Sequence, residues 1–375
     1  MSCDVDITII GAGVIGLAIA CEISQENRSV IILEKNEASG RETSSRNSGV
    51  IHSSILNPSG SWNAELCYEG NSLLYEFAQR YNISHRKTGK LLVAVESEET
   101  SALEALYERR SEGLKMQLLT RKEMNILEPD VNGKIGIIIP SAGVIDAYQL
   151  MQVYLGIART KGAQIVLKSA VTGLEKLQEG YSLRIQENDC LTELKSRIVI
   201  NSAGLLSDKI ASLAGIDIIK EGYALSYFKG EYYNINPNKT QHLRNRLVYP
   251  VNSSDGLVRI HTVLGLDDRV RLGPNFYPCD KLDYSIDDSR KQLFYRGTTR
   301  LLPHIDYEDI EPESTGIMPR TYTIDQPFEN FIIKHESERG LSGLINLVGI
   351  ESPGLTASLA LAKYIKRLVA DIIGN

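Results

Sequence analysis

Residues 5–34 read VDITIIGAGVIGLAIACEISQENRSVIILE, and this stretch decides the fold of the 375-residue chain. A short apolar run with β-branched residues leads into a glycine cluster, an apolar periodic stretch and a second apolar run that ends in an acid. The order predicts a strand at 5–10, a helix from Val14 to about Ser24 and a strand at 29–34. Such a βαβ unit implies an α/β protein with a buried parallel sheet.

The glycine cluster matches GxGxxG and stands between a strand and a helix, which is the context that the motif requires. Its first glycine allows a sharp turn, its second lets the backbone approach a pyrophosphate, and its third lets helix and strand pack closely. The helix N-terminus offers unpaired N–H groups and a positive dipole end to the phosphates. The motif therefore predicts a dinucleotide site that includes Gly11, Gly13, Val14, Ile15 and Gly16.

Glu34 ends the second strand, 18 residues after Gly16. At that place a carboxylate accepts hydrogen bonds from a ribose diol, and it disfavours a 2′-phosphate, so NADP is not expected. We assign Glu34 and the adjacent Lys35 to the cofactor. The motif by itself does not choose between NAD and FAD.

Composition excludes several classes of protein. The chain is 42% hydrophobic and 23% charged, with a net charge of −6 and no basic block, so no nucleic-acid partner is expected. No run of about 18 apolar residues and no N-terminal signal pattern occur, and we expect a cytoplasmic protein, with peripheral membrane contact left open. No cysteine or histidine cluster has metal-site spacing, and we expect reduced thiols and no metal. The cysteines are Cys3, Cys21, Cys67, Cys190 and Cys279.

Further patterns divide the chain into two kinds of sequence. Residues 223–335 are rich in Tyr, Pro, Asp and Arg and poor in long helical patterns, which predicts a second, β-rich domain. We expect a discontinuous dinucleotide-binding domain of residues 1–85, 145–222 and 336–375, and a substrate domain of residues 86–144 and 223–335. Expected helices are 62–81, 97–113, 120–127, 147–161 and 355–373; expected strands are 90–95, 164–167 and 344–348, with a meander at 171–199.

The segment Glu42-Thr43-Ser44-Ser45-Arg46-Asn47-Ser48-Gly49-Val50-Ile51-His52 resembles the flavin-contacting loop of the D-amino-acid-oxidase superfamily. NSGVIH followed by a helix with LCYEG is more closely similar to L-2-hydroxyglutarate dehydrogenases and their relatives. The resemblance implies FAD in a Rossmann-type domain beside a β-rich substrate domain. It assigns Ser44 and Ser45 to the pyrophosphate, and Asn47, Ser48 and Gly49 to the isoalloxazine ring.

Other segments resemble the superfamily in the same order along the chain. Residues 201–205 (NSAGL) resemble a conserved turn of the family, residues 272–275 (LGPN) a hairpin of the substrate domain, and residues 349–358 (GIESPGLTAS) the C-terminal flavin segment. The cofactor residues that this implies are Val171, Ala203, Gly204, Gly349, Ser352, Gly354, Leu355 and Thr356. Covalently flavinylated members use a cysteine near that last segment, and none follows Cys279, so we expect non-covalent FAD, with His52 as a candidate for a histidyl link.

Oxidation of an alcohol by a flavin needs a base for the hydroxyl proton, and histidine suits this role at neutral pH. His52 ends the flavin loop, and His261 matches a histidine of the hydroxyglutarate enzymes. We predict both as catalytic residues.

A 2-hydroxy or 2-amino acid also needs a cation for its carboxylate, and a bidentate arginine is the usual choice. The family often carries this arginine in a G-[IV]-R-P segment. Here residues 316–320 read GIMPR, so Met318 stands at the arginine position. Arg320 and Arg259 are the alternative cations, and Tyr249 and Tyr232 are candidate hydrogen-bond donors to the substrate.

The leading hypothesis is an FAD-dependent oxidoreductase that transfers a hydride from a small 2-hydroxy acid, similar to L-2-hydroxyglutarate, to N5 of the flavin. The electron acceptor is then oxygen, a quinone or another carrier. An oxidase or dehydrogenase of amines or amino acids, such as glycine, sarcosine, proline or a D-amino acid, is the alternative. A flavoprotein scaffold without turnover is a third hypothesis, and the acidic charge balance disfavours an RNA-modifying enzyme.

Overall fold

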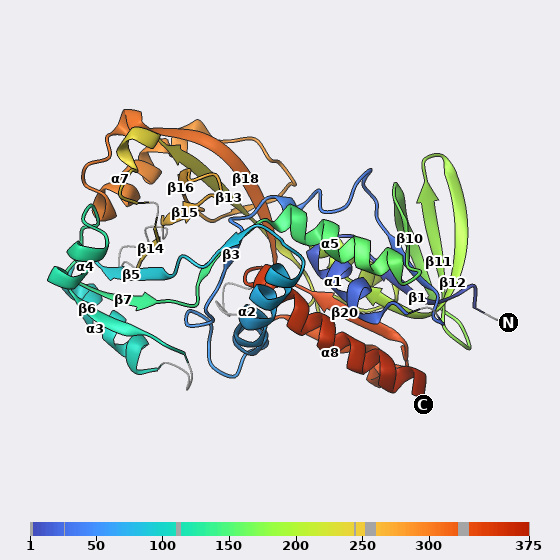
Figure 1. Cartoon of the computed structure of the whole chain (residues 1–375). Helices are drawn as coiled ribbons and strands as arrows, with labels where there is room; N and C mark the ends of the chain where they lie inside the picture. Colours follow the sequence, from blue (N-terminus) through green and yellow to red (C-terminus); the bar gives the residue numbers. More distant parts are fainter. Residues whose placement is uncertain are drawn as a thin grey trace.

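The computed structural model describes residues 3–25, 27–109, 114–243, 245–251, 260–321 and 330–374 (Figure 1). β1 (Val5–Ile10) lies inside an eight-stranded sheet, between β2 (Val30–Leu33) and β12 (Cys190–Asn201), and is parallel to both. β9 (Gln164–Val166) pairs with β2, and β20 (Leu344–Val348) pairs with the last residues of β12, again in parallel. The carboxyl ends of these strands therefore share one edge, where ligands bind in open α/β sheets.

Antiparallel strands extend this sheet on both sides. β19 (Ile332–His335) pairs with β20, while β10 (Ser169–Lys176) and β11 (Tyr181–Glu187) form a meander with the first half of β12. Their apolar side chains pack with α6 (Ser207–Leu213) over one face of the sheet.

Helices cover the opposite face. α1 (Val14–Ile23) packs against α5 (Ala147–Thr160) and α8 (Gly354–Gly374), and α8 also packs against α2 (Trp62–Arg80) (Figure 1). Every residue of α1 except Glu22 is buried, because the helix lies between the sheet and two other helices. The sequence predicted each of these helices within one or two residues of its observed ends. No described helix is long and apolar enough to cross a membrane.

The part of the chain away from this sheet carries two further sheets. A four-stranded sheet has the order β14 (Leu247–Pro250), β5 (Lys90–Ala94), β7 (Ile135–Ile139) and β6 (Gln117–Thr120). α3 (Ser97–Glu108) packs on β5 and β7, and α4 (Arg121–Leu127) packs on β6 and β7.

A five-stranded sheet is built around β13 (Ser226–Ile235). Its partners are β18 (Ile310–Arg320), β17 (Tyr277–Cys279) and β16 (Val270–Leu272), and β15 (Thr262–Leu264) pairs with β16. α7 (Lys291–Leu301) packs on this sheet, and its Phe294 stacks on Tyr233 of β13 with ring centroids 4.2 Å apart. The α/β fold class and the β-rich second part are thus confirmed.

The sequence did not predict several short elements. These are β6, β7 and α7, together with a small sheet of β3 (Val50–Ile51), β8 (Gly143–Ile145) and β4 (His85–Arg86) that connects the two parts. The segment boundaries that we gave for the two domains stay a prediction. Residues 332–335, which that division placed in the substrate domain, pair as β19 with β20 of the large sheet.

The α2–α8 contact can be tested with two helical glycines. A Cβ atom at Gly70 of α2 would lie 2.2 Å from the carbonyl oxygen of Thr356, whereas a Cβ at Gly156 of α5 would meet nothing within 4 Å. Alanine gains about 0.5–1 kcal/mol over glycine inside a helix. We therefore expect G156A to stabilise the holoenzyme by up to about 1 kcal/mol, and G70A to destabilise it, in urea-induced unfolding. Stabilisation of both variants would contradict the close packing of α2 on α8.

Candidate functional site

The glycine turn after β1 forms the base of the site. Gly11 has a φ of +100°, and a Cβ there would lie 2.6 Å from the carbonyl oxygen of Ser202, on the turn after β12. A Cβ at Gly16 would lie 2.0 Å from the carbonyl oxygen of Gly11. The first and third glycines therefore allow contacts between backbones, as the motif predicts, while Gly13 precedes α1 and faces the cavity.

Glu34 holds the turn from the end of β2. Its two carboxylate oxygens accept hydrogen bonds from the backbone N–H groups of Ala12 (2.9 Å) and Asn36 (2.8 Å). The side chain is buried but lines a cavity together with Lys35, Gly11 and Val171. The lone pairs that remain on the carboxylate are available to a ribose diol.

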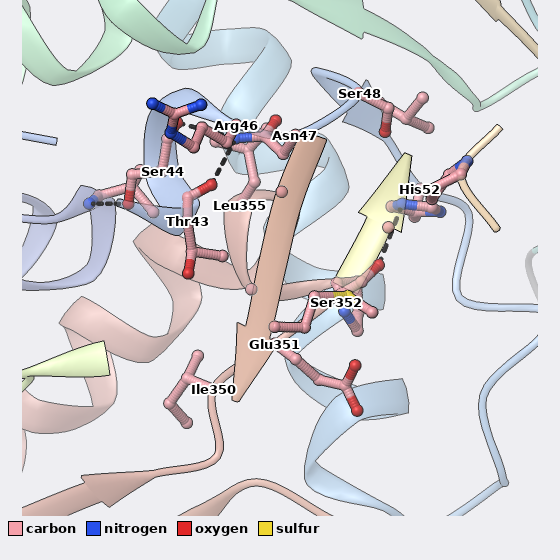
Figure 2. A pocket seen from close by; sticks show the side chains of 18 of the residues that line it. Thr43, Ser44, Arg46, Asn47, Ser48, His52, Ile350, Glu351, Ser352 and Leu355 are labelled. Atoms are coloured by element: carbon pink, nitrogen blue, oxygen red, sulfur yellow. Dashed lines mark hydrogen bonds between the residues drawn. The ribbon is translucent and has the colours of Figure 1, made fainter. Parts of the chain in front are cut away.

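The loop after residue 42 covers the start of α1. The hydroxyl of Ser44 accepts a hydrogen bond from the backbone N–H of Val14 (2.9 Å), so its own proton is available to a ligand (Figure 2). The Asn47 amide donates to the carbonyl oxygen of Ser44 (2.8 Å) and accepts from the N–H of Gly49 (2.8 Å). Asn47 thus fixes the loop with its polar atoms and presents the rest of its side chain to the cavity.

Two neighbouring cavities share the walls formed by Gly13, Thr43, Ser44, Ser202 and Gly204. The smaller one, of about 130 Å³, runs from Glu34 to Ala203, and the larger one, of about 350 Å³, runs from α1 to β13, β14 and β18. Predicted residues that line the larger cavity are Gly13, Val14, Ile15, Ser44, Asn47, Ser48, His52, Gly204, Tyr232, Tyr249, His261, Arg320, Ser352, Gly354 and Leu355.

Five predicted cofactor residues line neither cavity: Gly16, Ser45, Gly49, Gly349 and Thr356. Ser45 is exposed, and its hydroxyl donates to the carbonyl oxygen of Glu42 (3.3 Å). Gly49 and Gly349 have φ values of +64° and +69°, so both serve the turn of the chain. Arg259, the alternative cation, lies outside the described residues.

The His52 imidazole lines the larger cavity, and its backbone is held from two helices. Its N–H donates to the hydroxyl of Thr356 in α8 (3.0 Å), and its carbonyl oxygen accepts from Asn71 in α2 (2.8 Å). The ring Nε2 lies 3.4 Å from the hydroxyl of Ser352, which directly precedes α8 (Figure 2). Burial, and then the charges of Lys90 and His261, hold the pKa of His52 well below its usual value, so the ring is neutral at pH 7.

His261 lies in the same cavity and stacks on Tyr249, with ring centroids 3.7 Å apart. The ammonium group of Lys90 lies over the ring of Tyr249, 3.9 Å from its centroid. Lys90 was not predicted as a site residue, because a lysine at the start of an apolar strand usually faces solvent. Only the pairing of β5 between β14 and β7 buries it.

Arg320 at the end of β18 lines the cavity beside Met318. Its Nε donates to a carboxylate oxygen of Glu351 (2.8 Å), and its guanidinium lies 5.0 Å from the ring centroid of Phe228. Glu351 was not predicted, although it falls within the flavin-like segment. Burial raises the pKa of Glu351, while Arg320 acts in the opposite direction.

Comparison with known proteins gives this site a family. A family model described as FAD dependent oxidoreductase (DAO) matches residues 6–368. L-2-hydroxyglutarate dehydrogenase from Arabidopsis thaliana mitochondria is 34% identical, over 96% of this chain and 82% of that protein. L-2-hydroxyglutarate dehydrogenase from Escherichia coli K12 is 28% identical, over 79% of this chain and 71% of that protein.

Solved structures agree in fold. L-α-glycerophosphate oxidase from Mycoplasma pneumoniae with FAD bound has a TM-score of 0.85 and 25% identity, over 98% of this chain and 94% of that one. Glycine oxidase from Geobacillus kaustophilus has a TM-score of 0.80 and 22% identity, over 99% of this chain and 95% of that one. The paired cavities, with the glycine turn and Glu34 at one end and an apolar wall at the other, fit an elongated dinucleotide. FAD is the cofactor.

The two adjacent serines offer a matched test of the cofactor site. We expect S44A to raise the dissociation constant of FAD about tenfold, because it removes a cavity hydroxyl and the partner of the Val14 N–H, a loss of about 0.5–2 kcal/mol. S45A should leave the constant within about twofold. Quenching of flavin fluorescence during titration of apoprotein measures both. Equal effects of the two substitutions would contradict the placement of Ser44 at the cofactor.

Proposed function

This chain belongs to the DAO family of FAD-dependent oxidoreductases, and we propose that it oxidises a small 2-hydroxy acid of the L-2-hydroxyglutarate type. The relatives that match over most of the chain support a hydroxy acid as the substrate. The observation that carries the proposal is a neutral histidine beside the flavin segment, in a cavity that is also lined by three cationic residues, Arg46, Lys90 and Arg320.

The reaction removes two electrons and two protons from the substrate and leaves a 2-oxo acid. When bound, FAD would supply the two-electron acceptor at N5 for the hydride of the carbinol carbon. His52 takes the hydroxyl proton on a ring nitrogen, because the neutral imidazole accepts a hydrogen bond where an imidazolium does not. The electrons then pass to oxygen, a quinone or another carrier.

The backbone clamp on His52 orients this base. Thr356 and Asn71 hold the N–H and the carbonyl oxygen of the same residue, so its ring starts from a fixed Cα position. His261, stacked on Tyr249, lines the same cavity and would hydrogen-bond the substrate. We propose that FAD is held without a covalent bond, because none of the five cysteines lines either cavity.

Charge distinguishes the two substrate classes. A hydroxy acid brings only negative charge, which Arg320 and Lys90 attract, whereas an amine or amino acid also brings an ammonium group. The one carboxylate that faces this cavity among the described residues, Glu351, is already paired with Arg320. The cavity therefore favours the hydroxy acid over the amine-directed alternative.

Anaerobic reduction of the flavin tests the proposed function. L-2-Hydroxyglutarate should bleach the flavin absorbance of the wild-type holoenzyme, and glycine, sarcosine, proline and D-alanine should not. The D-enantiomer of 2-hydroxyglutarate serves as the stereochemical control. Bleaching by an amino acid and not by L-2-hydroxyglutarate would replace the proposal with the amine-directed function, and bleaching by neither would favour the scaffold.

The lowered pKa of His52 predicts the pH profile. At saturating L-2-hydroxyglutarate, the rate of flavin reduction should stay level from pH 8 to pH 6.5 and fall only at lower pH, since the base is lost as pH falls through its pKa. H52Q should slow the reduction by about 10²–10⁴-fold, and H242Q, at an exposed histidine outside the cavities, should not. A wild-type rate that already halves near pH 6.5, or an unimpaired H52Q enzyme, would exclude His52 as the base.

A further inference from the structure

Lys90 is a buried cation without an anionic partner in the described part of the chain. The side chain is 1% exposed, and its ammonium group faces the ring of Tyr249 at 3.9 Å. Burial lowers its pKa to about 8, and Cys67 is the one group that raises it. No described aspartate or glutamate forms an ion pair with it, in contrast to Lys229, which is equally buried and pairs with Asp283 at 3.2 Å.

An arrangement of this kind lowers the stability of the free protein. A buried charge is costly unless it is paired, and an apolar residue of similar volume is more favourable at such a place. The face of the Tyr249 ring offsets part of this cost. The remainder is recovered if an anion enters the cavity, which Lys90 lines together with His52 and His261.

The position of Lys90 indicates which part of a substrate it reaches. His52 touches Ser352 and is clamped to α8, so it stands on the flavin side of the cavity. Lys90 and Tyr249 belong to β5 and β14 of the four-stranded sheet, and β3 lies between that sheet and α8 (Figure 1). A substrate whose carbinol carbon is next to His52 therefore extends its far end toward Lys90.

Arg320 would contact the end of the same substrate that is opposite to Lys90. It is paired with Glu351, which stands next to Ser352 in the flavin segment. In the substrate orientation proposed here, this cation would contact the first carboxylate of a 2-hydroxy acid, next to the carbinol carbon.

We propose that Lys90 binds the second carboxylate, remote from the carbinol carbon, of a dicarboxylic 2-hydroxy acid, and so selects dicarboxylic over monocarboxylic substrates. The identity of the substrate as a hydroxy acid rests on the proposed function. The binding of a second carboxylate by Lys90 can be measured without turnover, by titration of a ligand into the oxidised enzyme.

The binding test compares glutarate with pentanoate, which has the same chain length and a methyl group in place of one carboxylate. Each is titrated into oxidised holoenzyme at pH 7, and the flavin absorbance or the heat of binding is followed. Wild type should bind glutarate at least about 30-fold more tightly, the ratio expected when one buried charged pair is lost. K90M should lose this preference, and K90R, which keeps the charge, should retain part of it.

K229M is the matched control, because it also removes a buried lysine. The Lys229 side chain lies on one face of β13, and the cavity residues Gly230 and Tyr232 lie on the other. K229M should keep the wild-type preference for glutarate. Flavin content and thermal unfolding check the folding of every variant. K90M without ligand should unfold at a higher temperature than wild type, because it removes an unpaired buried charge.

A dependence on pH gives a second readout for Lys90. The titratable groups that face it are His52, His261, Cys67 and Tyr249. Burial raises the pKa of Cys67 to about 12 and that of Tyr249 further, and His52 is already neutral. Glutarate affinity should therefore weaken above about pH 8 in wild type, as Lys90 loses its proton, and the K90M enzyme should lack this decline.

Each outcome decides for or against the inference. A glutarate preference that survives in K90M, or a wild type that binds pentanoate equally well, would overturn it. In parallel, kcat/KM for L-2-hydroxyglutarate over 2-hydroxypentanoate should fall in K90M by about 30-fold or more. Equal losses with both substrates would overturn the assignment to the second carboxylate. A wild type that binds glutarate through Lys90 but oxidises no hydroxy acid would refute only the proposed function.

Discussion

Behind the site, the hydroxyl of Thr356 joins a segment near the start of the chain to the C-terminal helix. It accepts from the N–H of His52 (3.0 Å) and donates to the carbonyl oxygen of Val50 (3.3 Å), while its own residue is fully buried in the first turn of α8. The C-terminal helix α8 thus fixes β3 and His52, which directly follows that strand. The position of Ser352, just before α8, then brings its hydroxyl to the His52 ring, so the flavin segment and the base share one support.

Most of the FAD-binding fold could be predicted from the sequence, because its signals are local. Glycines at 11, 13 and 16 and the apolar runs around them give the βαβ unit directly, and the N-caps Ser61 and Asp146 stand where α2 and α5 begin. Short strands such as β6 and β8 were missed, since three or four residues carry no periodicity. α7 was missed because its apolar face holds few residues within a polar, tyrosine-rich region, and these residues pack on the sheet of β13 and β18.

The site was predictable only where a motif fixes the backbone. The residues at the start of α1 and before α8 line the cavity as their motifs imply, whereas Ser45 is turned outward beside an inward Ser44. A motif marks a segment, but the direction of each side chain depends on the turn, here a single 3₁₀ turn at 43–45. Thr356 and Gly49 support the site from behind, and no pattern in the sequence separates support from contact.

Two of the cations that line the cavity, Arg320 and Lys90, are held in opposite ways, and this difference has consequences for selectivity. Arg320 is paired with Glu351, which weakens its attraction for an anion in the cavity. Lys90 has no such partner among the described residues, and burial lowers its pKa to about 8. Below that pH the charged lysine lowers the free energy of unfolding. This cost becomes smaller as the pH rises toward the usual pKa of lysine. This cost at neutral pH increases the difference in affinity between a ligand with a carboxylate at Lys90 and one with a methyl group there. The carboxylate removes the cost of the unpaired charge, whereas the methyl group leaves it in place. Discrimination between a carboxylate and a methyl group therefore exceeds the attraction of the pair alone.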